Sequence, residues 1–305
     1  MAKKISLPPS MKQSIFIFSV IFLGIVFPIG HDWVFLIRYN LMIMLFFAFL
    51  SIDFEWKILQ RSHLVLLLAN LVVPLLLFAI LRPISLTYAL IGFVIGICPT
   101  AAAAPVLAQF LRARVGYVTT SVLLSSPFVA LAIPFILPLL LPVSSSLSVG
   151  DIFFPVMIVI GVPLLASLMT QQVSRRLAQQ LLRLRHVSFY LFLLNVFIGC
   201  GKATHFIRHE STDTMYALLG IAAITGIICL LQFKLGERFE GPELQMASSL
   251  SFGRKNTMFG LWLALTFVEP TVGLGPIFYI IFQNVYNSYQ ILQLEKEDRK
   301  DRALS

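Results

Sequence analysis

The sequence has little charge. Only 12% of its 305 residues are Asp, Glu, Lys or Arg, whereas a soluble domain carries about 25%. Hydrophobic residues make up 58% of the chain and the mean hydropathy is +0.89. These values exclude a soluble enzyme, a disordered chain and a secreted disulfide scaffold. They predict an all-α integral membrane protein.

Cysteines are few, and acidic residues are absent from the long apolar runs. Cys98, Cys200 and Cys229 lie far apart in separate apolar stretches, so their spacing indicates neither a metal-ligand pair nor a disulfide bridge. The apolar runs contain no carboxylate pair and no nucleophile–base set. The sequence therefore predicts no enzymatic activity, no cofactor and no metal.

The net charge of +9 comes from 23 Lys and Arg residues. They are strung between the apolar runs, whereas a nucleic-acid-binding protein gathers its basic residues on one face. Nucleic acid is therefore not an expected partner. Basic residues in this arrangement are typical of the loops of a multi-pass membrane protein, whose expected partner is the lipid bilayer.

A helix needs about 20 apolar residues to cross the hydrocarbon core. By this criterion we predict ten transmembrane helices, at 13–29, 39–52, 64–81, 86–111, 118–142, 152–170, 187–204, 214–233, 246–268 and 272–293. The basic N-terminal segment before the first run imitates a signal peptide. No small-residue cleavage site follows it, so the first helix is predicted to be retained.

The distribution of basic residues predicts the orientation. With ten spans, the N-terminus, the C-terminus and four loops share one side, which holds 17 of the 23 Lys and Arg residues. The opposite side holds four, namely Arg38, Arg82, Lys202 and Arg208. Because Lys and Arg are enriched in cytoplasmic loops, both termini are predicted to lie in the cytoplasm, with the chain in the cell (inner) membrane.

The fourth and ninth spans are interrupted. The fourth contains Cys98-Pro99-Thr100, followed by alanines and Pro105, and proline breaks or kinks a helix. The ninth contains Ser248-Ser249 and then the run from Ser251 to Asn256. One such break is equally consistent with a kink in a packed helix. Two breaks at matching positions favour a substrate site, because irregular backbone at membrane depth occurs where protein or a wet cavity surrounds it.

Each interruption falls in the fourth span of a five-span half. We therefore predict a 5+5 inverted repeat, with one repeat over 1–146 (helices 1–5) and the second over 147–305 (helices 6–10). Five spans per half place the two copies in opposite orientations, as in many secondary transporters.

Basic and amide side chains at membrane depth are the candidate site residues. Arg254 and Lys255 have no acidic residue near them in sequence, and a basic residue at a helix centre costs about 2.5–3.5 kcal/mol on insertion scales. They are therefore expected to face the protein interior, a cavity or an anion. Gln283 and Asn284 in the tenth span are expected to have a functional role. Asn70 is interpreted as a packing residue between helices.

Six residues at the two helix interruptions and in the tenth span, together with the number of spans, match the sequence pattern of a known family. They are Cys98, Pro99, Gly253, Asn256, Gln283 and Asn284. On these residues the chain resembles the bile acid:sodium symporter family. The resemblance implies a panel domain from spans one, two, six and seven, and a core domain from the other six. It also implies two broken helices that cross near the midplane, where organic anions bind beside two sodium ions.

The resemblance fails at the ion ligands. In the ninth span the family reads Glu-x-Gly-x-Gln-Asn, and Ser251 and Lys255 replace the Glu and Gln here. In the fourth span Ala104 and Pro105 replace a Ser-Asn pair. A hard cation needs several oxygen ligands, so a site that loses a carboxylate and gains an ammonium is expected to repel sodium.

The sequence therefore predicts a secondary transporter of a small organic anion that works by alternating access without sodium. The expected substrate-binding residues are Thr100, Arg254, Lys255, Asn256, Gln283 and Asn284, and the degenerate ion site comprises Ser251, Ala104 and Pro105. One alternative is a membrane scaffold or regulatory protein that keeps a transporter fold without transporting. The other is metalloid efflux, since the related arsenite exporters also use a Cys at the fourth-helix break; they carry an acidic residue in the ninth helix that this chain lacks.

Overall fold

The computed structural model describes residues 9–51, 59–142, 147–209 and 215–304, and within these ranges the regular elements are all helices. In chain order they are α1 (Pro9–Val26), the 3₁₀ helix η1 (Pro28–Trp33), α2 (Val34–Leu50), α3 (Arg61–Leu81), α4 (Leu86–Ile97), α5 (Ala104–Phe110), α6 (Val115–Leu140), α7 (Val149–Val173), α8 (Arg175–Leu182), α9 (Val187–His209), α10 (Met215–Gly236), α11 (Gln245–Gly253), α12 (Thr257–Phe267) and α13 (Pro270–Leu304).

Six helical stretches in the described residues are long and apolar enough to cross a membrane. They are Pro28–Leu50, Arg61–Leu81, Val115–Leu140, Val149–Val173, Val187–His209 and Tyr216–Gly236. Many of their large apolar side chains are exposed, such as Leu139 at 81% and Val173 at 79%. An apolar surface of this extent is expected when lipid is the solvent. The chain is a multi-pass membrane protein.

The observed helices differ most from the predicted spans at three places. α2 begins at Val34, five residues before the predicted start at 39, and follows η1 directly, so Arg38 lies inside the helix and not in the loop before it. The predicted loop 171–186 contains the short helix α8, which hydropathy misses because half of its eight residues are Arg or Gln. α13 continues to Leu304, 11 residues beyond the predicted end at 293, since a polar helix can extend into water.

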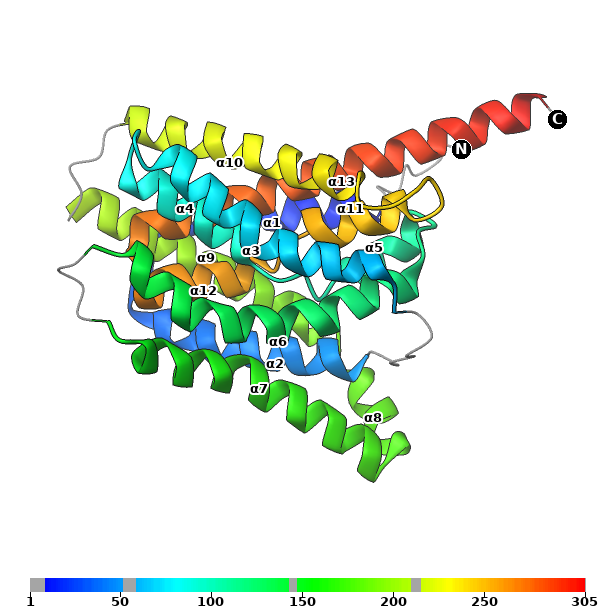
Figure 1. The fold of residues 1–305 in the computed structure, drawn as a ribbon, viewed down its shortest axis with the longest axis horizontal. Coiled ribbons are helices and arrows are strands. Elements are labelled where there is room, and N and C mark those ends of the chain that lie inside the picture. The colour runs from blue at the N-terminus through cyan, green and yellow to red at the C-terminus, as the bar shows by residue number, and fades with distance from the viewer. Residues whose placement is uncertain (1–8, 52–58, 143–146, 210–214, 305) are drawn as a thin grey trace, which may run out of the picture.

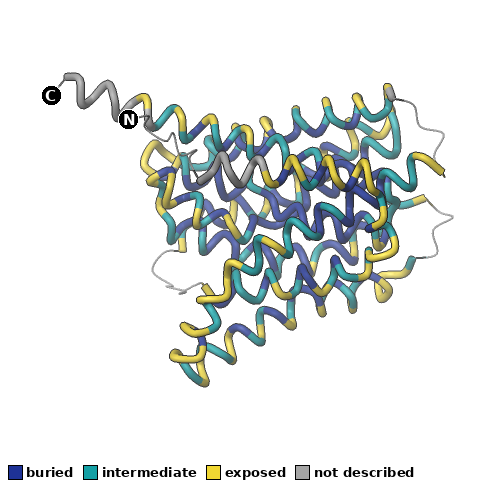
Figure 2. Tube along the Cα trace, turned by 180° about the vertical axis from the view of Figure 1, so that it is seen from behind, coloured by how far each residue is buried: buried dark blue, intermediate teal, exposed yellow. Residues whose placement is uncertain are grey.

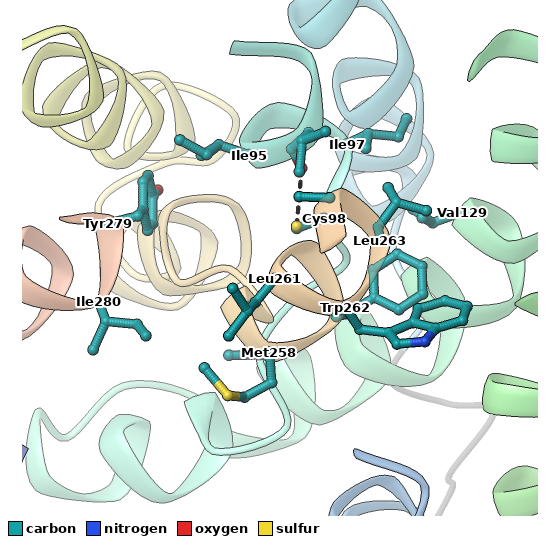
Figure 3. Packing of buried hydrophobic residues seen from close by; sticks show 14 of the residues in the cluster. Ile95, Ile97, Cys98, Val129, Met258, Leu261, Trp262, Leu263, Tyr279 and Ile280 are labelled. Carbon is teal, nitrogen blue, oxygen red and sulfur yellow. Dashed lines mark hydrogen bonds between the residues drawn. The ribbon is translucent and has the colours of Figure 1, made fainter. Parts of the chain in front are cut away.

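The helices form one bundle with the interrupted helices at its centre (Figures 1 and 2). α2 and α7 pack side by side at one edge, and α8 follows α7 at the end of the bundle where α13 also leaves it. In α4, every residue from Ala89 to Ile97 is buried. α12 is buried to the same extent along most of its length. Figure 3 shows Leu261 and Trp262 of α12 packed near Cys98.

Candidate functional site

Both predicted helix interruptions are present in the structure. α4 ends at Ile97 and α5 begins at Ala104, and α11 ends at Gly253 and α12 begins at Thr257. The second interruption is shorter than predicted, because Ser248, Ser249 and Ser251 are still helical. Pro105 lies in the first turn of α5, where its missing N–H removes no hydrogen bond. It therefore starts the second half-helix and does not interrupt it.

The two unwound segments pair with each other through their main chains. The Ala101 N–H donates to the Arg254 carbonyl at 2.8 Å, and the Asn256 N–H donates to the Pro99 carbonyl at 2.8 Å. Thr100 and Lys255 form an isolated antiparallel bridge between these two bonds. An unpaired buried amide or carbonyl costs free energy comparable to a lost hydrogen bond, so each segment satisfies the polar groups that unwinding leaves free in the other.

Side chains from neighbouring helices reinforce this pairing. The Thr100 hydroxyl donates to the Ser251 carbonyl at 2.7 Å, and the Thr100 N–H donates to the Ser125 hydroxyl of α6 at 3.0 Å. Thr100 is 1% exposed and Ser251 is fully buried. Thr100 therefore joins the first interruption to α11 as well as to α6.

The Lys255 side chain points into the protein and is 1% exposed. Its ammonium donates to the Asn70 side-chain oxygen of α3 at 2.6 Å and to the Gly96 carbonyl of α4 at 3.0 Å. The ammonium also lies 4.4 Å from the centre of the Phe252 ring, a favourable cation–π distance. The cation is thus held by two neutral oxygens and an aromatic face.

No acidic side chain pairs with Lys255 among the described residues. The titratable neighbour is Cys98, whose thiol donates to the Val94 carbonyl at 3.0 Å. Burial of a charge is costly unless other groups replace its hydration. Asn70 and Gly96 provide that replacement for the Lys255 ammonium.

Arg254 has a different environment. Its side chain is partly exposed and lies near Cys229 of α10 and Tyr279 of α13. The Nε and Nη1 atoms are both buried and have no hydrogen-bond partner in the described part of the chain. Buried guanidinium N–H groups without a partner are strong, fixed donors suited to an anionic oxygen.

The other predicted site residues are distributed between the crossing and α13. The Asn256 side chain caps α12 by accepting from the Phe259 N–H at 3.3 Å, and the residue is 8% exposed. Gln283 is buried, and its side-chain oxygen has no partner among the described groups. The Asn284 amide donates to the Ile280 carbonyl of its own helix at 2.7 Å. Thr100, Ser251, Lys255 and Asn256 thus meet at the crossing, and within the described part of the chain no hydrogen bond joins Gln283 or Asn284 to them.

Sequence reasoning missed two residues of the site. Asn70, interpreted as a packing residue, is the closest ligand of the Lys255 ammonium. The Tyr279 hydroxyl donates to the Gly253 carbonyl at 2.6 Å and is 3.0 Å from the Gln232 side-chain oxygen of α10. The sequence did contain a signal for Asn70. A lysine at membrane depth without a carboxylate partner needs another polar group at the same depth, and few of the spans contain one. No sequence signal distinguishes Tyr279 from an ordinary membrane tyrosine.

A comparison with protein-family models adds the decisive observation. The model of the sodium bile acid symporter family matches residues 38–210, more than half of the chain. The chain belongs to the sodium bile acid symporter family. The matched segment of this family member includes the first interruption and Asn70, whereas Lys255, Asn256 and α13 lie beyond it. No curated protein matches the chain.

Proposed function

We propose that this member of a membrane transporter family is a secondary transporter of a small organic anion and that it does not need sodium. The observation that carries the proposal is the Lys255 ammonium, which lies where the two unwound segments meet and is held by the oxygens of Asn70 and Gly96. These are the kinds of oxygen that ligate a hard cation. With a tethered cation already bound to them, a sodium ion at the same place would meet a like charge.

The magnitude of that repulsion supports the proposal. Two unit charges 4 Å apart repel by about 4 kcal/mol at an effective dielectric constant of 20. Ser251, at the position of the family's carboxylate, supplies no compensating charge. Ala104 and Pro105, at positions where the resemblance implies ion ligands, offer no side-chain oxygen. We therefore infer that the local charge balance is independent of any bound ion.

The second basic residue supplies the attraction for an anion. Arg254 lies in the same unwound segment, and its guanidinium has buried donors that no described group uses. We propose that these donors bind the anionic group of the substrate. Hydrogen bonds that orient the ligand would come from Thr100, Asn256, Gln283 and Asn284. The buried ammonium of Lys255 would add positive electrostatic potential at the place where the two unwound segments pair.

We further propose that the chain works by alternating access and that its ten membrane-crossing segments form a 5+5 inverted repeat. The two repeats would cover 1–146 and 147–305. The boundary between them is next to residues 143–146, which lie outside the described part of the chain. The crossing segments beyond the six long helices would be α1, α4–α5, α11–α12 and α13. The reciprocal hydrogen bonds between the two interruptions support this symmetry, because each segment both donates and accepts once. In transporters of this type, one repeat or bundle rocks against the other around the site.

The transport proposal is tested by a ligand screen on the purified full chain. Thermal unfolding is followed in a panel of mono- and dicarboxylates, sulfonates and cholate, in NaCl and in KCl of equal ionic strength. We expect at least one anion to raise the unfolding temperature equally in both salts, since a ligand that binds the folded state stabilises it. A shift that appears in sodium only would overturn sodium independence, and stabilisation by cations or neutral solutes alone would overturn the choice of substrate class.

The matched variants for this screen are Arg254→Met and Arg254→Lys. Loss of a hydrogen bond from a charged group costs about 1.5–3 kcal/mol, so Arg254→Met is expected to weaken binding of any anion hit about tenfold or more. Arg254→Lys keeps the charge and is expected to lose less. If both variants bind the hit like the unmodified protein, Arg254 is not part of the site, and the scaffold interpretation gains support.

The proposed topology places both termini and α8 in the cytoplasm of an inner-membrane protein. Gln179 in α8 and Gly150 at the start of α7 are exposed at opposite ends of α7. The native cysteines Cys98, Cys200 and Cys229 are all buried and give little background. In intact cells we expect a membrane-impermeant maleimide to label Gly150→Cys and to leave Gln179→Cys unlabelled until the cells are lysed. The opposite pattern would reverse the orientation.

A further inference from the structure

We propose that the face formed by α2, α7 and α8 binds one acidic phospholipid, with its headgroup on the arginines of α8 and one acyl chain in a hollow between α2 and α7. Neither feature takes part in the proposed transport site, so the inference does not depend on the identity of the substrate. The argument rests on two separate observations at adjoining places in the fold.

The first observation is a set of unpaired arginines. Arg175, Arg176, Arg183 and Arg185 lie on α8 and the turn after it, and all four are exposed. None of them forms an ion pair within the described residues. The sequence contains no Asp or Glu between residues 152 and 209, so α8 and the chain flanking it carry no counter-charge of their own.

The apolar side of α8 indicates where this charge sits. Leu177 is 43% exposed, and Leu181, four residues on and therefore on the same face of α8, is partly exposed. Leu184, in the turn after α8, is 48% exposed. A short helix with arginines on one face and exposed leucines on another lies in the membrane interface. Figure 1 shows α8 beside the end of α7, and Figure 2 shows its surface as largely exposed. The guanidinium groups are therefore at headgroup level, where each basic residue near an anionic surface contributes about 1 kcal/mol.

The second observation is a hollow of about 250 Å³ between α2 and α7. Its lining is apolar throughout and comprises Met42, Ile43, Phe46, Phe47, Val162, Pro163 and Ala166. The hollow exists because the α7 residues that line it fill little of the space between the two helices: Ala166 has a small side chain, and Pro163 is buried against α2. A hollow of about 150 Å³ accommodates a benzene ring, so this one accommodates a segment of an alkyl chain.

The two features are at matching depths. From Ala166 to the end of α7 at Val173 there are seven residues, or about 10 Å along the helix. One leaflet of the hydrocarbon core is about 15 Å thick, so an acyl chain from a headgroup at α8 reaches the hollow. Gln171 donates to the Leu50 carbonyl at 3.1 Å and so ties α7 to α2 between the hollow and α8. The phosphodiester suits the guanidinium because its oxygens match the planar donors of arginine.

The test uses the full chain in detergent and native mass spectrometry with two lipids that share acyl chains, palmitoyl-oleoyl phosphatidylglycerol and palmitoyl-oleoyl phosphatidylcholine. We expect the first phosphatidylglycerol to bind about tenfold more tightly than the first phosphatidylcholine. Replacement of all four arginines by glutamine is expected to bring this ratio close to one. Replacement of the four by lysine keeps the charge and is expected to retain most of the preference.

The hollow has its own matched pair of variants. Ala166→Trp fills the space and is expected to weaken binding of both lipids several-fold. Leu165→Trp places the same side chain one residue away, at a position 62% exposed that does not line the hollow, and is expected to bind as the unmodified protein does. Equal affinities for the two lipids in the unmodified protein, or unchanged binding in Ala166→Trp, would overturn the proposal.

Two further outcomes identify a different occupant. Glycerol 3-phosphate carries the headgroup chemistry without a chain and is expected not to displace phosphatidylglycerol; if it does, the arginines form a soluble-phosphate site and the lipid proposal is wrong. A dimer that Ala166→Trp dissociates would show that a second copy of the chain covers this face. Elution volume and unfolding temperature of every variant are compared with those of the unmodified protein, so that lost binding is not confused with lost folding.

Discussion

Replacement of Gly253 by alanine is expected to prevent the chain from reaching its folded state. Gly253 is the last residue of α11, immediately before the second interruption. A Cβ atom at this position would overlap the Phe233 Cδ1 and Cγ atoms of α10 and would lie 2.8 Å from the Phe233 Cα atom. Carbon atoms of this kind do not approach so closely, and Phe233 is completely buried, so the ring has no space to move into.

The expected loss of folding stability in Gly253→Ala is large because the overlap involves a main-chain atom of α10. Overpacking a core costs about 1–3 kcal/mol when side chains can adjust, and here α10 itself would have to shift. Such a shift would also disturb the hydrogen bond between Tyr279 and the Gly253 carbonyl. We expect a loss of about 3 kcal/mol or more, seen as aggregation or loss of the monodisperse peak in size-exclusion chromatography.

Gly161 provides the control. It lies inside α7, and a Cβ there would have no atom within 4 Å. Alanine is a better helix former than glycine by about 1 kcal/mol, so Gly161→Ala is expected to be neutral or slightly stabilising. If Gly253→Ala unfolds at the same temperature as Gly161→Ala, the close packing of α10 against the second interruption is incorrect.

The double variant Ser251→Glu with Lys255→Gln is expected to create a response to sodium that the unmodified protein lacks. Lys255→Gln removes the ammonium and frees the oxygens of Asn70 and Gly96. Ser251→Glu restores a carboxylate at a fully buried position whose hydroxyl has no partner among the described groups. Two neutral oxygens, a new amide oxygen and a carboxylate then make a plausible ligand set for a hard cation.

The measurement is the unfolding temperature in NaCl and KCl at equal ionic strength. At a sodium concentration one hundred times its Kd, stabilisation would be about 2.7 kcal/mol. The single variants are the controls: Lys255→Gln lacks the carboxylate, and in Ser251→Glu the carboxylate pairs with Lys255. Neither is expected to distinguish the two salts. Ala104 and Pro105 supply no ligand, so the stabilisation of the double variant by sodium is expected to be smaller than that of a sodium-dependent relative.

Two results would contradict the argument. If the unmodified protein is already more stable in sodium than in potassium, the Lys255 ammonium does not occupy a cation site. If the double variant is indifferent to sodium although it folds, the oxygens of Asn70 and Gly96 are not arranged to ligate an ion.

Much of this fold follows from hydropathy, because membrane helices must satisfy their backbone internally and therefore consist of long apolar runs. The runs around Leu66 and Val159, for example, predict α3 and α7 to within three residues at each end. The interruptions were predictable for a related reason. Pro99 and the polar run before Asn256 are poorly compatible with a continuous helix at that depth.

The partners of the site residues were not predictable in the same way. Lys255 and Asn70 are 185 residues apart in sequence, and no local pattern reveals that α3 brings an amide to the second interruption. Pro105 shows a subtler limit, since proline both breaks a helix and begins one, and only the structure distinguishes these roles. α8 is missed because it is short and half of its residues are Arg or Gln, so no long apolar run marks it.

The pairing of the two interruptions has a consequence for how such proteins diversify. The hydrogen bonds from Ala101 to Arg254 and from Asn256 to Pro99 involve main-chain atoms only. Side chains at these positions are consequently replaceable without loss of the joint that holds the two half-helices together. A lineage with this joint can exchange the side chains at the crossing, and with them its ligand preference, while the main-chain hydrogen bonds between the two half-helices are kept.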